Sequence, residues 1–367
     1  MKIVIFGLTI SSSWGNGHAT LWRGLCKYLI RAGHDVTFFE RDVPYYAGAR
    51  DFPQLPGGSL LLYASWPTVE QTARRAIVDA DAIILTSYCA DGLEVTELML
   101  EQARPLKIFY DLDTPITLAR LHAGERLSYI GPDGLAGFDL VLSFTGGPRL
   151  VEEYRKKLGA RQIMPLYGHV DPDVHHPVMP QPHYRADLSY LGTYSDDRQR
   201  TLEQLFVHPA RARQDLRFLI GGAQYPQDFP WSPNIYFVRH LPPAEHAAFF
   251  ASSRLTLNVT RRAMADMGWC PSGRLFEAAA CGTPIISDPW DGIEHFFSPG
   301  EEILLADSTP DALAALAHDD DVLEQIARRA RERTLDEHSS AKRAEELISL
   351  LEQTHGRNAA DLATEEA

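Results

Sequence analysis

Residues 272–287 read SGRLFEAAACGTPIIS and join a predicted helix to a predicted buried strand. Ser272 is a residue type that caps helices, and the small and apolar residues after it let such a helix pack closely. Gly282, Thr283 and Pro284 then end the helix, and the β-branched residues that follow favour a strand. The stretch therefore predicts one helix-to-strand connection of an α/β sheet.

Short apolar runs and amphipathic helical stretches alternate on both sides of this connection. The first series of predicted strands begins with Lys2–Phe6 and ends with Phe138–Phe144, and a second series begins at Leu188–Leu191 and ends at Ile303–Leu305. This alternation is typical of parallel sheets covered by helices on both faces. We therefore predict two Rossmann-like, doubly wound α/β domains, with ligands at the carboxyl ends of the strands and in a cleft between the domains.

Changes in texture along the chain predict the domain limits. The N-terminal domain covers residues 1–167, and a segment rich in proline and histidine follows it as a linker over residues 168–187. The C-terminal domain covers residues 188–336. A last helix over residues 337–355 can pack back on the N-terminal domain, and we expect residues 356–367 to form a flexible tail.

The composition is that of an ordinary globular protein of the cytoplasm. The 367 residues contain 35 Lys and Arg against 49 Asp and Glu, a formal net charge of -14. This balance disfavours binding to nucleic acid, which needs clustered cationic side chains. No apolar run reaches the ~18 residues that a transmembrane helix needs. The four cysteines lie far apart in the sequence, which fits a reducing compartment and gives little support to a zinc site.

The first candidate site is the loop after the first strand, FGLTISSSWGNGHAT at residues 6–20. Gly15 and Gly17 let the backbone approach a ligand, and free amides at the start of the next helix favour an anion. The spacing is not G-x-G-x-x-G, so a nicotinamide dinucleotide is disfavoured. His18 would begin the helix, where the dipole suits a neutral base. The structural alternative is a long turn with Gly17 as helix cap and His18 as a capping or surface histidine.

The second candidate is FYDLDTP at residues 109–115, where Asp111 and Asp113 follow a predicted strand. Two carboxylates at a strand end can contact an acceptor, act as a base or hold a divalent cation. Asp113 followed by Thr114 and Pro115 is also typical of a helix N-cap. This gives a purely structural explanation for Asp113. We expect no bound metal, and we keep both aspartates as catalytic candidates after His18.

The third candidate lies within residues 258–297. Arg274 and Glu277 are three residues apart on the predicted helix and therefore share a face. The helix amides and the guanidinium can bind the phosphates of a nucleotide, while the carboxylate binds its ribose hydroxyls. The structural alternative is a salt bridge between the two side chains on a solvated helix, which the apolar residues around them disfavour.

The segment GRLFEAAACGTPIIS closely resembles the E-A-x-A-x-G-T-P segment of family 4 GT-B glycosyltransferases. Together with LGTYSDDRQ at residues 191–199 it is most similar to the CgeB-type, spore-maturation-like branch, and GHVDPDVHHPV at residues 168–178 resembles the hinge G-V-D-x-x-x-F-x-P. The resemblance spans residues 2–351. It implies the GT-B fold and a cytoplasmic, hexosyltransferase-like enzyme that moves a sugar from a nucleoside-diphosphate sugar, such as a UDP-sugar, to an acceptor without metal or cofactor.

By this resemblance Glu277 matches the carboxylate that binds the donor ribose. The expected donor-binding residues are Gly15, Gly17, Gly192, Thr193, Arg198, Arg261, Ser272, Gly273, Arg274 and Glu277, and the expected catalytic residues are His18, Asp113 and Asp111. Retaining members of the family carry a second glutamate eight positions earlier, where this chain has Trp269. The outcome at the anomeric carbon therefore stays open between retention, which the family favours, and inversion.

Two alternatives keep the fold and change the activity. A nucleotide-sugar epimerase of the hydrolysing type would release or isomerise the sugar without an acceptor. A catalytically degenerate relative would bind a nucleotide sugar without turnover, and the loss of the second glutamate motivates this hypothesis. The acceptor itself, whether a small molecule, a glycan or a protein, is not indicated by any motif.

Overall fold

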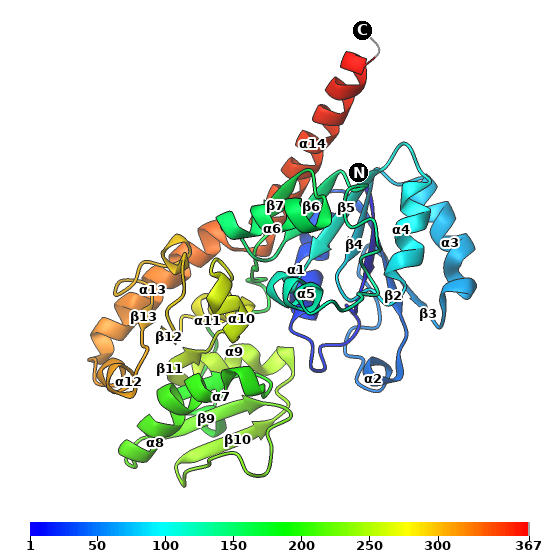
Figure 1. Cartoon of the computed structure of the whole chain (residues 1–367). Coiled ribbons are helices and arrows are strands. Elements are labelled where there is room, and N and C mark those ends of the chain that lie inside the picture. The colour runs from blue at the N-terminus through cyan, green and yellow to red at the C-terminus, as the bar shows by residue number, and fades with distance from the viewer. Residues whose placement is uncertain (366–367) are drawn as a thin grey trace. The chain divides into compact units, whose positions relative to one another are not determined.

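The computed structural model describes residues 1–365 and divides into two compact units (Figure 1). Unit 1 combines Met1–Tyr167 with the C-terminal segment from Ser340, and unit 2 is Gly168–Ser339. Each unit contains one parallel sheet flanked by helices. This confirms the predicted pair of doubly wound α/β sheets.

Unit 1 has a seven-stranded sheet in the order β3-β2-β1-β4-β5-β6-β7. Its strands are β1 (Lys2–Gly7), β2 (Asp35–Arg41), β3 (Ser59–Tyr63), β4 (Ala82–Thr86), β5 (Leu106–Asp111), β6 (Leu140–Ser143) and β7 (Ile163–Pro165). Its helices are α1 (His18–Arg31), α2 (Pro44–Ala47), α3 (Trp66–Val78), α4 (Gly92–Leu100), α5 (Thr114–His122), α6 (Pro148–Leu158) and α14 (Ser340–Glu365). The strand order reverses between β1 and β4, so their carboxyl ends form the switch point where ligands bind in such sheets.

Unit 2 has a six-stranded sheet in the order β10-β9-β8-β11-β12-β13. Its strands are β8 (Ala186–Leu191), β9 (Phe218–Gly222), β10 (Ile235–Arg239), β11 (Ser253–Asn258), β12 (Ile285–Ser287) and β13 (Leu304–Leu305). Its α-helices are α7 (Asp196–Leu202), α8 (His208–Ala212), α9 (Pro243–Ala251), α10 (Arg262–Met267), α11 (Gly273–Ala280), α12 (Thr309–Leu316) and α13 (Asp320–Glu337), and a π-helical turn at Glu203–Val207 joins α7 to α8. The switch point of this sheet lies between β8 and β11.

The C-terminal helix α14 differs from its predicted extent. It begins at Ser340 and continues to Glu365, so residues 356–365, which the sequence analysis placed in a flexible tail, are helical; the last two residues of that tail lie outside the described chain. No glycine or proline follows Gly356 to stop the helix. The helix packs on α1 within unit 1, where Leu347 and Leu351 are fully buried.

Candidate functional site

Arg274 fastens α11 to the switch point of unit 2. Its Nε donates to the carbonyl of Leu191, the last residue of β8, and its Nη1 donates to Oδ1 of Asn258, the last residue of β11, at 3.1 Å. The guanidinium also lies 5.3 Å from the ring centre of Tyr190. Burial lowers the pKa of Arg274, because the charged form has lost solvating water. These bonds bring the amino end of α11 to the carboxyl ends of two adjacent strands.

The backbone after β8 passes close to Arg274. A Cβ atom on Gly192 would lie 2.8 Å from the Tyr190 hydroxyl and 3.1 Å from Nη2 of Arg274, so this position requires glycine. Arg198 on α7 donates from Nη1 to the Thr193 carbonyl at 3.3 Å, and its buried Nε has no hydrogen-bond partner among the described residues. Gly192, Thr193, Arg198 and Arg274 thus lie close together after β8, and their role in donor binding stays a prediction.

Ser272 and Arg261, two of the predicted donor-binding residues, have surroundings that their sequence context does not indicate. Ser272 occupies the N-cap of α11 in an extended conformation, but its side chain makes no capping hydrogen bond. The first amides of α11, those of Gly273 and Arg274, lie in the first turn and so have no carbonyl partner inside the helix. Arg261 pairs with Asp197 at 3.2 Å. The amino end of α11 therefore offers N–H donors suited to an anion, whereas Arg261 already has a carboxylate.

Glu277 lies one turn further along α11, between two histidines. Its Oε1 is 3.9 Å from Nε2 of His175 and its Oε2 is 3.9 Å from Nδ1 of His246, and the Glu277 side chain is 12% exposed. Burial lowers the pKa of His246 to about 4 and also lowers the pKa of His175, although the carboxylate acts in the opposite direction. The sequence left open a salt bridge between Arg274 and Glu277 on the helix surface. The guanidinium of Arg274 instead donates to Leu191 and Asn258.

The two histidines were missed at the sequence level. His175 stands where the hinge motif has phenylalanine, and His246 lies on α9 with no motif around it. Only the fold places them beside Glu277. Trp269, eight residues before Glu277, has a left-handed backbone with φ of 51°, and its ring centroid lies 5.2 Å from that of His295. It supplies an aromatic surface and no carboxylate at this position.

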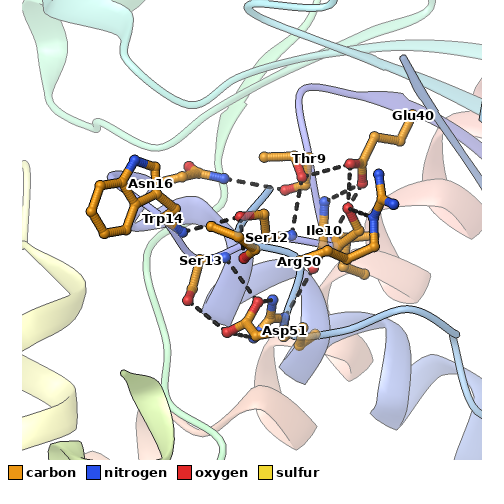
Figure 2. A network of polar contacts seen from close by, with 12 residues as sticks. Thr9, Ile10, Ser12, Ser13, Trp14, Asn16, Glu40, Arg50 and Asp51 are labelled. Carbon is orange, nitrogen blue, oxygen red and sulfur yellow. Dashed lines mark hydrogen bonds and ion pairs between the residues drawn. The ribbon is translucent and has the colours of Figure 1, made fainter. Parts of the chain in front are cut away.

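In unit 1, the loop between β1 and α1 is held by a buried carboxylate (Figure 2). Glu40 on β2 is 1% exposed and accepts hydrogen bonds from the Thr9 hydroxyl at 2.7 Å, the Ile10 amide at 2.8 Å, and the amide and hydroxyl of Ser11 at 2.9 and 2.5 Å. One side chain therefore satisfies four donors of the loop. This fixes the backbone at the switch point between β1 and β4 before a ligand arrives.

A second acidic residue holds the following part of the loop. Asp51 accepts hydrogen bonds from the amide and hydroxyl of Ser13 at 3.0 and 2.6 Å and pairs with Arg23 of α1 at 2.6 Å (Figure 2). The side chain of Asn16 donates to the Thr9 carbonyl at 3.2 Å and accepts from the amide of His18 at 3.1 Å. The loop carrying the predicted donor-binding glycines is thus preorganised.

His18 is the first residue of α1, and the exposed residues Gly15 and Gly17 precede it. Gly15 has φ of 59°, which favours glycine, and Gly17 is the N-cap. The Nδ1 atom of His18 is buried without a hydrogen-bond partner in the described chain. His18 thus directly follows the glycines of this loop at the start of α1, and its role as a base stays a prediction.

Asp111 and Asp113 have different surroundings. Asp111 ends β5, is fully buried, and accepts hydrogen bonds from the Tyr154 hydroxyl and, at 3.0 Å, from the Asp113 amide. Burial raises the pKa of Asp111. Asp113 occupies the N-cap of α5 without a side-chain capping bond and interacts with the hydroxyl of Tyr88. The geometry thus favours a structural role for Asp111 and leaves Asp113 as the more accessible carboxylate.

Comparisons with known proteins agree with this architecture. Residues 198–349 match a family model described as glycosyl transferase-like. No curated protein matches the sequence. None of the helices in the described part of the chain has the length and apolar character needed to cross a bilayer.

Solved glycosyltransferase structures superpose on almost the whole chain. Sucrose-phosphate synthase from Thermosynechococcus elongatus has a TM-score of 0.68 at 15% identity, over 97% of this chain and 100% of that one. The Anabaena protein HepE in complex with UDP and glucose has 0.65 at 13%, over 96% and 99%. An alpha-glucosyltransferase in complex with UDP has 0.67 at 13%, over 96% and 99%. The chain therefore has the GT-B fold of these glycosyltransferases, and its C-terminal unit carries the glycosyl transferase-like match.

Proposed function

We propose that the protein is a hexosyltransferase-like glycosyltransferase that uses a nucleoside-diphosphate sugar, with UDP-sugar as the first candidate donor. The observation that carries this proposal is the arrangement at the switch point of unit 2. There Arg274 ties the amino end of α11 to β8 and β11, and Glu277 projects one turn later. The helix amides and Arg198 suit the two phosphates, and the carboxylate suits the ribose hydroxyls.

The proposed chemistry centres on the leaving group. As the anomeric C–O bond breaks, negative charge accumulates on the nucleoside diphosphate, and positioned N–H dipoles and guanidinium groups stabilise that charge. In this chain Arg198 and the first amides of α11 supply these groups, so we propose a reaction that does not require a metal ion. UDP is present in the solved complexes of HepE and of the alpha-glucosyltransferase, which supports uridine as the first base to test.

The proposal leaves two properties open: the identity of the acceptor, and whether the configuration at the anomeric carbon is retained or inverted. The family resemblance favours retention, while Trp269 removes the second glutamate. With a net charge of -14 we propose an acceptor other than nucleic acid. The four cysteines, all within the described chain, are buried and not joined in disulfides, which fits the proposed cytoplasmic location.

A donor screen tests the proposal. We expect one of UDP-, GDP- and dTDP-sugars to raise the apparent melting temperature of the chain, because a ligand that binds only the folded state stabilises it by mass action. Binding and transfer should persist in EDTA. Product analysis with donor alone separates an epimerase, which would convert the sugar without an acceptor, from a transferase. Failure of every nucleotide sugar to bind would contradict the proposal.

Trp269 favours a second candidate, a protein that binds nucleotide sugars without transferring them. The residue offers an aromatic surface where retaining relatives have a carboxylate. Donor binding without transfer across acceptor panels of small molecules, glycans and peptides would support this candidate. Sugar transfer to any acceptor would exclude it.

His18 is the proposed acceptor base. We expect His18→Ala to lower kcat by about 100-fold or more, the usual contribution of general base catalysis, with little change in donor Kd. Asp111→Asn should keep most of the activity, because Asp111 is enclosed by Tyr154 and the Asp113 amide. Measured kcat values and donor affinities of both variants check this assignment. Full activity in His18→Ala would leave His18 as a helix-start residue only.

The same Asp111→Asn variant should also change the pH dependence of stability. The pKa of Asp111 in the folded chain is raised from 3.8 by burial, so folding favours its protonated form. The contribution of this group is fully present below its unfolded pKa and falls as pH rises through the folded value. Urea unfolding of wild type and variant across this range should show that fall only in the wild type. An equal pH dependence in both proteins would contradict the raised pKa.

A further inference from the structure

Three potential metal ligands from three segments of unit 2 converge at one point. His175 lies in the irregular segment that opens the unit, His246 on α9 and Glu277 on α11. One ligand atom from each lies within 4.8 Å of the others. Each contact from the carboxylate to a ring nitrogen is 3.9 Å, which is too long for a hydrogen bond. The carboxylate therefore makes no hydrogen bond to either ring.

The hydrogen bonding of His246 determines which ring nitrogen presents a lone pair to Glu277. Its Nε2 lies 3.2 Å from the carbonyl oxygen of Leu241. A carbonyl only accepts, so Nε2 carries the hydrogen and Nδ1 of the neutral ring presents a lone pair to Glu277. Two acceptors then face each other, an arrangement that favours a cation between them. Histidines that bind metals commonly hold the other ring nitrogen against a backbone carbonyl in this way.

His175 provides a second, independent observation. It is 2% exposed, and neither of its ring nitrogens has a hydrogen-bond partner in the described chain. A buried polar group without a partner is destabilising, so a ligand that occupies the lone pair is favoured. The nearest cation on the same helix, Arg274, is already engaged by Leu191 and Asn258.

We propose that His175, His246 and Glu277 bind one Zn²⁺ ion, with water in the fourth position, and that this ion keeps the donor ribose away from Glu277. Two imidazoles and one carboxylate form a common zinc ligand set. Zinc bonds of about 2.0–2.2 Å place tetrahedral ligand atoms roughly 3.4 Å apart, so each carboxylate–ring distance of 3.9 Å needs to shorten by about 0.5 Å and the ring–ring distance, within 4.8 Å, by up to about 1.4 Å. The ion acts as an inhibitor and takes no part in the transfer.

Zinc binding by the full chain tests the site directly. The protein is stripped with EDTA, dialysed and titrated with ZnSO₄ by calorimetry, and Co²⁺ is used as a spectroscopic probe of tetrahedral coordination. We expect one high-affinity ion per chain, with affinity reduced about 10-fold or more in His175→Ala and His246→Ala. His176→Ala, which changes the exposed neighbour, is the matched control and should bind like wild type. No stoichiometric binding, or equal affinity in His175→Ala and His176→Ala, would overturn the proposal.

Glu277→Gln provides a variant that keeps the shape of the site if an alanine variant does not fold. It replaces the carboxylate by an amide, a much weaker zinc ligand, and circular dichroism verifies the fold. Weaker zinc binding in this variant supports the site, and unchanged binding overturns it.

The inhibitory role rests on the proposed function, because it requires Glu277 to bind the ribose. We expect UDP to weaken zinc binding to the wild-type protein, because both ligands compete for that carboxylate. If saturating UDP leaves the zinc affinity unchanged, the inhibitory role is overturned. If UDP binds and zinc does not, the zinc site fails while the proposed function stands. If zinc binds and no nucleotide does, the proposed function fails and the metal site stands.

Discussion

Glu277→Ala is expected to weaken UDP binding by about 100-fold and to remove measurable transfer. The carboxylate is the proposed acceptor for two ribose hydroxyls, and a hydrogen bond to a charged group contributes about 1.5–3 kcal/mol. At the lower end of this range, losing both corresponds to about two orders of magnitude in Kd. Both contacts from the Glu277 carboxylate to the rings of His175 and His246 are 3.9 Å long, so the variant removes no hydrogen bond from either histidine, and circular dichroism verifies that the fold is retained. Calorimetric titration with UDP in the presence of EDTA measures the effect without competing metal.

Two further variants make the Glu277 result specific. Glu324→Ala, which removes an exposed carboxylate on α13, applies the same charge change away from the site and should leave Kd unchanged. Glu277→Gln keeps one oxygen acceptor and should fall between wild type and alanine. Wild-type UDP affinity in Glu277→Ala would remove this residue from the donor site and with it the main support for the proposed activity.

Glu40→Ala is expected to lower the free energy of unfolding by about 4 kcal/mol. The variant leaves four donors of the β1–α1 loop without their acceptor. Two of them are the backbone amides of Ile10 and Ser11, which cannot turn toward water, and each buried unsatisfied donor costs about 1–3 kcal/mol. Because the same loop carries Gly15 and Gly17, its disorder should also reduce activity.

Urea unfolding and amide hydrogen exchange check this prediction together. The amides of Ile10 and Ser11 should exchange faster in Glu40→Ala, since their protection depends on that carboxylate. Glu97→Ala, at an exposed position of α4, is the matched control and should change stability by less than about 0.5 kcal/mol. Unchanged protection of both amides would show that the loop is held by other contacts.

Much of the fold was predictable from the sequence because each buried strand is a short, continuous run of apolar residues. The strand predicted at Lys2–Phe6 is β1 (Lys2–Gly7), since a fully buried parallel strand is a continuous apolar run. The helix predicted to open at Ser272 is α11, which begins at Gly273. The prediction failed at the C-terminus, where residues 356–365 continue α14. Their helicity depends on a helix already nucleated and packed against α1, which composition alone does not reveal.

The candidate site was predictable only in part. Glu277, Arg274 and Gly192 could be selected from local motifs, but nothing in the motif shows that Arg274 contacts Leu191 and Asn258. Those contacts depend on the strand order that places β8 beside β11. The capping role of Ser272 was predicted from residue type, yet its hydroxyl makes no capping bond. The roles of His18, Asp111 and Asp113 stay predictions.

The two parallel sheets and the helix that carries Glu277 follow from local sequence patterns, because apolar periodicity, helix caps and glycine turns act between residues close along the chain. Folding then brings His175, His246 and Glu277 to one point and places Glu40 against a loop 29 to 31 residues earlier in the chain. Such contacts join segments far apart in sequence. Strand order and packing determine which residues meet in such contacts, and neither produces a recognisable pattern in the local sequence.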